Sequence, residues 1–154
     1  MKPALAFPFN DPDGTMFQHL RAILPDLKRH FERAYLCPPL STWEHSDHIQ
    51  QLQADDFFIL FPPEREMQIG EHFAYLYRRA AEFAPADQIL HLCYLDRMAF
   101  ALEGGYRDVF LRDVDSLSLE DVPLIFQRSQ RAWETHPQNY QELEGFVTKV
   151  GRNL

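Results

Sequence analysis

The sequence predicts an α/β fold, a three-layer sandwich in which helices flank a mostly parallel central sheet. Short apolar runs alternate with amphipathic stretches of helical periodicity along the chain, which is typical of this class. One run, 57–61, is apolar at every position, as is usual for a parallel strand buried on both faces. The chain has 154 residues, 45% of them hydrophobic and 14% aromatic, so we expect one sizeable core and a single domain spanning 1–154.

The first half predicts three strands and two helices. Thr15 opens the first helix, and Gln18 three residues later completes a capping-box pattern. Pro25 lies inside that helix and is expected to kink it. The expected elements are a strand at 4–9, a helix at 15–33, a strand at 34–37, a helix at 46–53 and a strand at 56–61.

The second half continues the alternation. Pro85 disfavours helical geometry in the residue before it, and Gly104-Gly105 interrupts a later helical stretch. The expected elements are a helix at 69–84, a strand at 88–95, helices at 97–103 and 107–114, a strand at 123–127 and a last helix at 137–150. Either this last helix caps the sheet or the chain is the N-terminal part of a longer protein, and we expect the second.

Composition limits the partners. The net charge of -8, the pI near 5.3 and the presence of only three lysines argue against a nucleic-acid partner. No apolar run approaches the roughly 20 residues of a membrane-spanning helix, so we expect no transmembrane segment and a cytoplasmic protein. Cys37 and Cys93 lie in or beside apolar runs, which indicates buried thiols and no disulfide framework. Composition leaves the oligomeric state open.

A polar loop, Asn10-Asp11-Pro12-Asp13-Gly14-Thr15, follows the first predicted strand. Open α/β sheets bind ligands outside the carboxyl ends of their strands, and this loop lies at such an end. Its two carboxylates are suited to bind a divalent cation, to accept hydrogen bonds from a ribose or a base, or to attack phosphorus. The same residue types also build turns, so a purely structural loop is the alternative.

The string Asp11-Pro12-Asp13-Gly14-Thr15-Met16 resembles the first motif of the haloacid dehalogenase superfamily of phosphohydrolases. The resemblance implies that Asp11 is a nucleophile, that Asp13 is a general acid and that magnesium shields the phosphate. That family also needs a later acidic pair and a lysine, whereas the later strand ends here offer Asp96 and Arg128. A magnesium-dependent phosphohydrolase therefore stays as an alternative function.

A second resemblance covers more of the chain. The segments at 9–14, 91–97 and 126–137 together resemble a poorly characterised bacterial family with a GT-A-type, nucleotide-diphospho-sugar transferase fold, which is Rossmann-like. The resemblance implies a glycosyltransferase-like protein that binds a nucleotide-sugar donor at the carboxyl ends of strands 1, 4 and 5. The donor-binding residues that it implies are Asn10, Asp11, Asp13 and Gly14 near the base or ribose, Asp96 and Arg97 near the diphosphate, and Arg128 and His136 on the same rim.

Metal-dependent members of that class carry Asp-x-Asp at the fourth strand end, and this chain has Tyr94-Leu95-Asp96. Asp96 is therefore the single candidate ligand for manganese or magnesium, and Arg97 is a candidate to neutralise the diphosphate instead. His45 and His48 lack a third ligand of matching spacing, so no zinc site is expected. The sequence does not identify a catalytic base, and a catalytically silent nucleotide-binding domain is a further alternative.

Overall fold

The structure is a computed structural model that describes residues 2–117 together with Gln138, Asn139 and Glu142. The chain divides into two compact units, 1–120 and 121–154. In the second unit the described residues are helical, and Nε2 of Gln138 donates to Oε1 of Glu142 at 2.9 Å. The strand predicted at 123–127 and most of the helix predicted at 137–150 lie outside the described residues.

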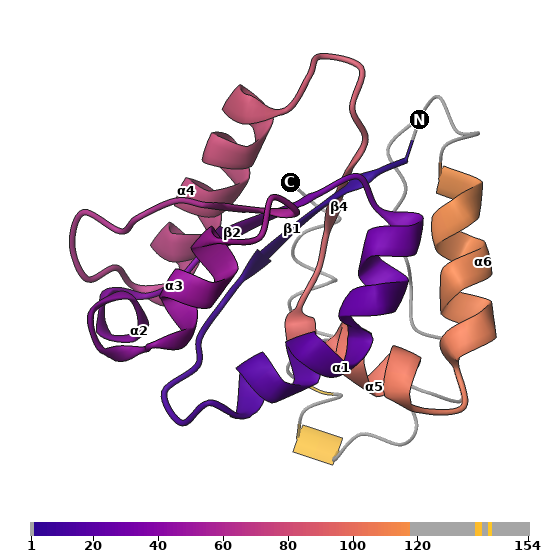
Figure 1. Ribbon diagram of the computed structural model, residues 1–154, viewed down its shortest axis with the longest axis horizontal. Coiled ribbons are helices and arrows are strands. Elements are labelled where there is room, and N and C mark those ends of the chain that lie inside the picture. The colour runs from indigo at the N-terminus through magenta and orange to yellow at the C-terminus, as the bar shows by residue number, and fades with distance from the viewer. Residues whose placement is uncertain (1, 118–137, 140–141, 143–154) are drawn as a thin grey trace. The chain divides into compact units, whose positions relative to one another are not determined.

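The described part of the first unit contains a four-stranded sheet in which every neighbouring pair is parallel. Its strands are β1 (Ala4–Pro8), β2 (Ala34–Cys37), β3 (Phe58–Leu60) and β4 (Leu90–Leu92), in the spatial order β3-β2-β1-β4. Figure 1 shows β1 between β2 and β4. Each strand falls within a predicted range, and β2 has the predicted bounds. β3 and β4 are shorter than predicted.

The helices confirm most of the predicted pattern. They are α1 (Thr15–His30), α2 (Leu40–His45), α3 (His48–Gln53), α4 (Ile69–Phe83), α5 (Leu95–Glu103) and α6 (Arg107–Leu117). The interruption at Gly104-Gly105 is confirmed, since α5 ends and α6 begins on either side of it. The helix α2 was not predicted, and α5 begins two residues earlier than predicted.

The predicted capping box at the start of α1 is wrong. The N-cap is Gly14, with a φ of 81°, and Thr15 is already the first helical residue. A positive φ suits glycine, and it turns the chain so that carboxylates upstream reach the first helical N–H groups. Asp11 and Asp13 therefore take the capping role that the sequence analysis gave to Thr15 and Gln18.

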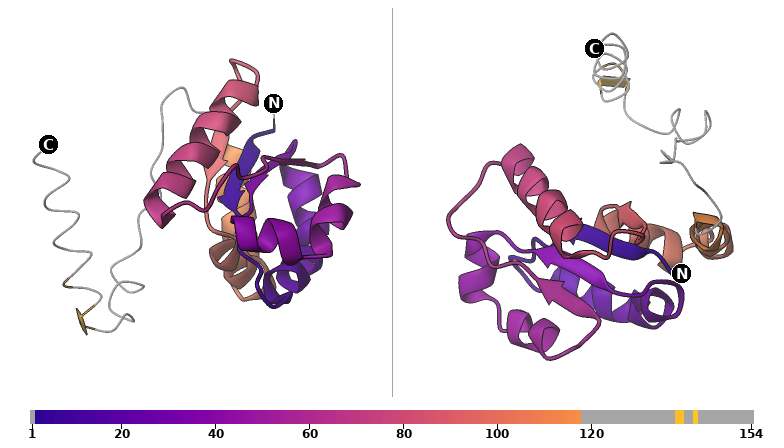
Figure 2. Two further views of the ribbon diagram at one scale, coloured as in Figure 1. Left: turned by 90° about the vertical axis from the view of Figure 1, so that its left-hand side faces the viewer. Right: turned by 90° about the horizontal axis from the view of Figure 1, so that it is seen from above.

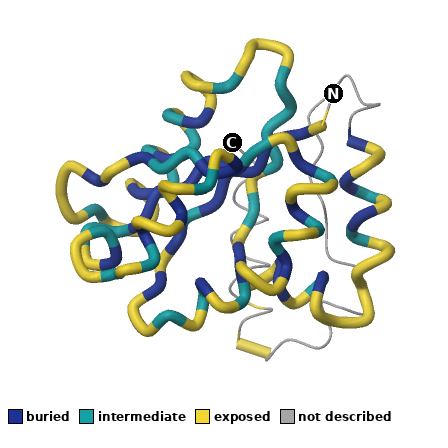
Figure 3. The backbone as a smooth tube through the Cα atoms, in the orientation of Figure 1, coloured by how far each residue is buried: buried dark blue, intermediate teal, exposed yellow. Residues whose placement is uncertain are grey.

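Alternate side chains of β1 pack against opposite layers of the fold. Leu5, Phe7 and Phe9 pack into the core formed with α1, α3, α5 and α6, whereas Ala4 and Ala6 face the cluster that includes α4. Figure 2 shows α4 on one side of the sheet and α1 on the other, and Figure 3 shows that most of β1 is buried, with Pro8 at its end half-buried. The unit is thus a small three-layer α/β fold of Rossmann-like type, as predicted.

The strand order reverses direction at β1. Along the chain, β2 and β3 are added in turn on one side of β1. The helix α4 then packs across β1, β2 and β4, and β4 follows it on the other side of β1. β4 pairs directly with β1, and the N–H of Cys93 donates to the carbonyl of Ala6 at 3.2 Å. Ligands of open α/β sheets bind at such a reversal, outside the carboxyl ends of the strands.

The two cysteines are free thiols close to these strand ends. Cys37 is buried at the end of β2, and burial raises the pKa of its thiol to about 12. Burial also raises the pKa of Cys93, whose Sγ lies 3.4 Å from Sδ of Met98. Both thiols are therefore protonated at neutral pH.

None of the described helices has the length and apolar character needed to cross a membrane.

Candidate functional site at the carboxyl ends of β1 and β4

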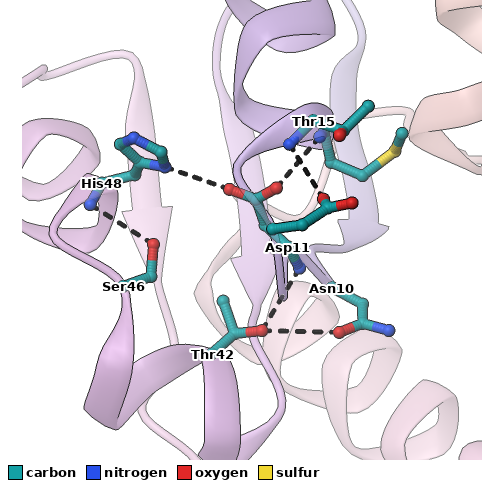
Figure 4. A network of polar contacts seen from close by, with 8 residues as sticks. Asn10, Asp11, Thr15, Thr42, Ser46 and His48 are labelled. Carbon is teal, nitrogen blue, oxygen red and sulfur yellow. Dashed lines mark hydrogen bonds and ion pairs between the residues drawn. The ribbon is translucent and has the colours of Figure 1, made fainter.

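Asp11, in the loop after β1, is buried, and its two carboxylate oxygens and its backbone N–H all make hydrogen bonds (Figure 4). Its Oδ1 accepts a hydrogen bond from the N–H of Met16 at 2.9 Å, and its Oδ2 lies 3.1 Å from Nδ1 of His48. Its own N–H donates to Oγ1 of Thr42 at 3.2 Å. Its side chain has 0% of its surface exposed, so Asp11 ties the β1 loop to α1, α2 and α3 and does not face solvent.

Asn10 and Thr42 continue this network. The Thr42 hydroxyl accepts from Asp11 and donates to Oδ1 of Asn10 at 3.4 Å. Thr42 is buried, whereas Asn10 is exposed, and Figure 4 shows its amide nitrogen on the side away from Thr42. Asn10 was predicted as a site residue and Thr42 was not. Of the two, Asn10 is the one that is available to a ligand.

Asp13 differs from Asp11 because it is exposed. Its Oδ1 accepts a hydrogen bond from the N–H of Thr15 at 3.0 Å, and that bond lowers the pKa of its carboxyl. Asp13 is therefore ionised at neutral pH and exposed. Together the two carboxylates bind N–H groups at the start of α1, so this helix N-terminus is not free to bind a phosphate.

His48, the first residue of α3, is a site residue that the sequence analysis did not select. Its ring stacks on Phe17 with the centroids 4.0 Å apart and the planes 6° from parallel. A Cβ on Gly14 would lie 3.1 Å from Cε1 of His48, so the glycine also leaves space for the ring. Asp11 lies 37 positions earlier in the chain, so no local sequence pattern signals the contact.

The end of β4 is arranged differently. The N-cap of α5 is Tyr94, and it makes no side-chain capping bond. Asp96 was expected directly at the strand end, but β4 ends at Leu92 and Asp96 lies in the first turn of α5. Asp96 and Arg97 are both exposed, and their closest charged atoms are 3.8 Å apart. Arg97 is therefore weakly engaged.

An open groove of about 370 Å³ lies between α1 and α5 and contains Asp96. It is lined by Met16, His19, Asp96, Ala99, Phe100, Glu103 and Gly104. Met16 is also the residue whose N–H is bound by Asp11, so the groove lies beside the β1 loop. Its volume is near the lower limit for small-molecule sites, and its acidic groups disfavour a phosphate within it.

A divalent cation fits these residues poorly. Within the described ranges, no group of three or more His, Cys, Asp or Glu side chains is arranged to hold a metal ion. Asp96 offers a single carboxylate beside an arginine, and both oxygens of Asp11 already accept hydrogen bonds. Magnesium and manganese generally need more oxygen ligands than these residues offer.

The remaining predicted site residues, Arg128 and His136, lie outside the described residues. Of the others, the structure gathers Asn10, Asp11, Asp13 and Gly14 in one loop, and it places Asp96 and Arg97 after the neighbouring strand. No family model matches the chain, and neither a curated protein nor a solved structure matches it. Any functional assignment therefore depends on the residues of this site.

Proposed function

We propose that the protein binds a nucleotide-diphospho-sugar across the carboxyl ends of β1 and β4 and transfers the sugar to an acceptor. The observation that supports this most directly is the reversal of strand order between β1 and β4, which is where such sheets bind nucleotides. Asp13 lies on one side of the reversal and Arg97 on the other, and both are exposed.

In this proposal the two strand ends bind different parts of the donor. The ionised carboxylate of Asp13 accepts hydrogen bonds from ribose hydroxyls or a base N–H, and it repels phosphate. The guanidinium of Arg97 presents N–H groups to the diphosphate in a fixed geometry. Stabilising the charge on the leaving diphosphate is then the main catalytic effect.

The phosphohydrolase alternative is disfavoured by the surroundings of Asp11. A nucleophilic carboxylate has to reach the phosphorus atom, and the side chain of Asp11 is fully buried. Both of its oxygens also accept hydrogen bonds from within the protein. Asp11 is thus better suited to positioning other groups than to covalent catalysis.

Calorimetry with UDP-sugars and GDP-sugars, each with and without manganese, tests the proposal. We expect saturable binding of one nucleotide series that does not depend on manganese. Failure of every nucleotide to bind would contradict the proposal. Binding without turnover would favour the catalytically silent domain. Magnesium-dependent release of phosphate from an aryl phosphate, abolished by Asp11→Asn, would support the phosphohydrolase.

A further inference from the structure

We infer that His48, held in place by Asp11, is a general base toward a ligand hydroxyl at the carboxyl edge of the sheet. This inference rests on the proposed function, because it names the group that removes the proton from the sugar acceptor. The inference is based on the contact between a buried carboxylate and a partly exposed imidazole. The carboxylate comes from the loop after β1, and the imidazole comes from the first residue of α3.

The buried carboxylate determines which nitrogen of His48 carries the proton. Oδ2 of Asp11 accepts from Nδ1, so Nε2 of the neutral ring holds the lone pair. Asp11 is itself held by the N–H of Met16 and by the Thr42 hydroxyl. The carboxylate therefore fixes both the tautomer and the direction of the ring, as in the orienting partner of a catalytic histidine.

The ring is held on further sides while Nε2 stays available. One face stacks on Phe17, and the edge at Cε1 lies against Gly14. The side chain keeps 31% of its surface exposed. Among the residues that the structure describes, Nε2 has no hydrogen-bond partner, and Figure 4 shows no contact drawn to it. A preorganised and unbonded Nε2 meets the geometric requirement for a general base.

In the proposed reaction, His48 acts on the hydroxyl of the sugar acceptor. The Nε2 lone pair takes the proton of an acceptor hydroxyl while the hydroxyl oxygen forms a bond to the anomeric carbon of the donor. The bond from that carbon to the diphosphate oxygen breaks, and the diphosphate leaves with the electron pair. The resulting imidazolium is stabilised by Asp11 through Nδ1, and it later releases its proton to solvent.

His45 provides a matched control in the same segment. It is exposed at the end of α2, and its Nδ1 lies 3.0 Å from the carbonyl oxygen of Ser41. Both histidines thus make one hydrogen bond through Nδ1, but the partner of His45 is a neutral carbonyl, whereas that of His48 is a buried carboxylate. A carboxylate partner fixes the tautomer that leaves the lone pair on the opposite nitrogen, and it holds that nitrogen in one direction.

Acylation of the full chain with diethyl pyrocarbonate tests the inference without a ligand. Peptide mass mapping gives the rate at each histidine. We expect His48 to react faster than the more exposed His45, and we expect Asp11→Asn to slow His48 by about tenfold or more while His45 is unchanged. Equal rates at the two histidines, or no effect of Asp11→Asn in a folded protein, would overturn the inference.

Turnover provides the second test. We expect the wild type to hydrolyse or transfer the sugar of a bound UDP- or GDP-sugar. His48→Asn keeps a donor for Asp11 but has no basic nitrogen, so it should lower the rate by about 100-fold or more with the donor Kd unchanged. His48→Gln is the second variant if His48→Asn does not fold, and His45→Asn is the control.

The outcomes separate the two proposals. If no donor binds the wild type, the proposed function fails, and the acylation rates alone decide whether His48 is an activated base. If the donor binds and either the wild type shows no turnover or the folded His48 variant keeps the wild-type rate, the general-base inference is overturned. The proposed binding site stands in that case.

Discussion

The two strand ends beside the strand-order reversal differ in how far their polar groups are already bonded. After β1, the carboxylates of Asp11 and Asp13 bind N–H groups at the start of α1, and Asp11 also holds His48. After β4, the N-cap of α5 makes no capping bond, and the exposed Arg97 has only a distant partner in Asp96. Most polar groups at the first end are therefore bonded within the protein, whereas those at the second end are not.

This difference indicates a division of roles. A loop that is held by several internal hydrogen bonds keeps its side chains in one arrangement, so it is suited to positioning His48 and presenting Asp13 to hydroxyl groups. The guanidinium of Arg97 after β4 is exposed and has only a distant partner in Asp96, so it is suited to bind an anionic group. The following substitutions test whether the first end contributes mainly to stability and the second mainly to binding.

The largest effect should come from Asp11→Ala. It removes the acceptor of the Met16 N–H and the partner of His48 at a buried position. We expect a loss of about 3–4 kcal/mol in the free energy of unfolding, measured by urea denaturation. Asp96→Ala is the control, and it should change stability by less than about 0.5 kcal/mol. Similar losses for both variants would show that the two strand ends do not differ as described.

The strands beneath the two ends also differ in their response to acid. Leu5 of β1 is paired in register with His91 of β4, and burial lowers the pKa of His91 from 6.5 to about 4. Between these values the unfolded chain binds more protons than the folded one, so this contribution to stability is lost as the pH falls.

Replacing the histidine isolates that contribution. Wild type should lose about 2–3 kcal/mol more than His91→Phe when urea denaturation is compared at about pH 7 and about pH 4.5. Phe31 and Phe110 already make edge-to-face contacts with the His91 ring, which favours acceptance of the phenylalanine. An equal acid sensitivity of the two proteins would contradict the assignment of a lowered pKa to His91.

Gly14→Ala should have the next largest effect. The φ of 81° strains any residue with a Cβ, and that Cβ would lie 3.1 Å from Cε1 of His48. We expect a destabilisation of about 2 kcal/mol in urea denaturation. Gly105→Ala is the matched control between α5 and α6, because nothing lies within 4 Å of its added Cβ. Tolerance of Gly14→Ala would indicate that the β1 loop is less constrained than described.

The smallest effect concerns binding. Arg97→Ala should weaken the affinity for the nucleotide-sugar by about tenfold, which is the loss of one charge-assisted contact. Its thermal stability should stay at the wild-type value, since Arg97 has no close partner among the described residues. Arg112→Ala on α6 is the control for the loss of one positive charge. Equal affinities for the two variants would remove Arg97 from the proposed site.

The sequence predicted the sheet and most helices because these depend on local periodicity and on turn residues. Continuous apolar runs located β2 and β3, and Gly104-Gly105 separated α5 from α6. The short helix α2 was missed because its few residues show no apolar repeat after Pro39. Its buried Thr42 is explained only by a hydrogen bond to Asp11, 31 positions away.

The position of the candidate site in the loop after β1 was predictable from the sequence, but the hydrogen bonds that connect its residues were not. The position of Asp11 and Asp13 after the first strand indicated a site, and the structure confirms that they lie at the carboxyl end of β1. The sequence could not show that Asp11 is buried while Asp13 is exposed, since this depends on how α2 and α3 fold over the loop. His48 was missed for the same reason.

The two native thiols provide a way to measure the contrast between the strand ends without any substitution. Cys37 lies opposite Pro8 at the end of β1, and Cys93 follows β4 directly. Because both thiols are protonated in the folded state, an alkylating reagent reports the rate at which each region opens. Cys93 should be labelled through local opening at low urea, whereas Cys37 should be labelled only as the whole sheet unfolds.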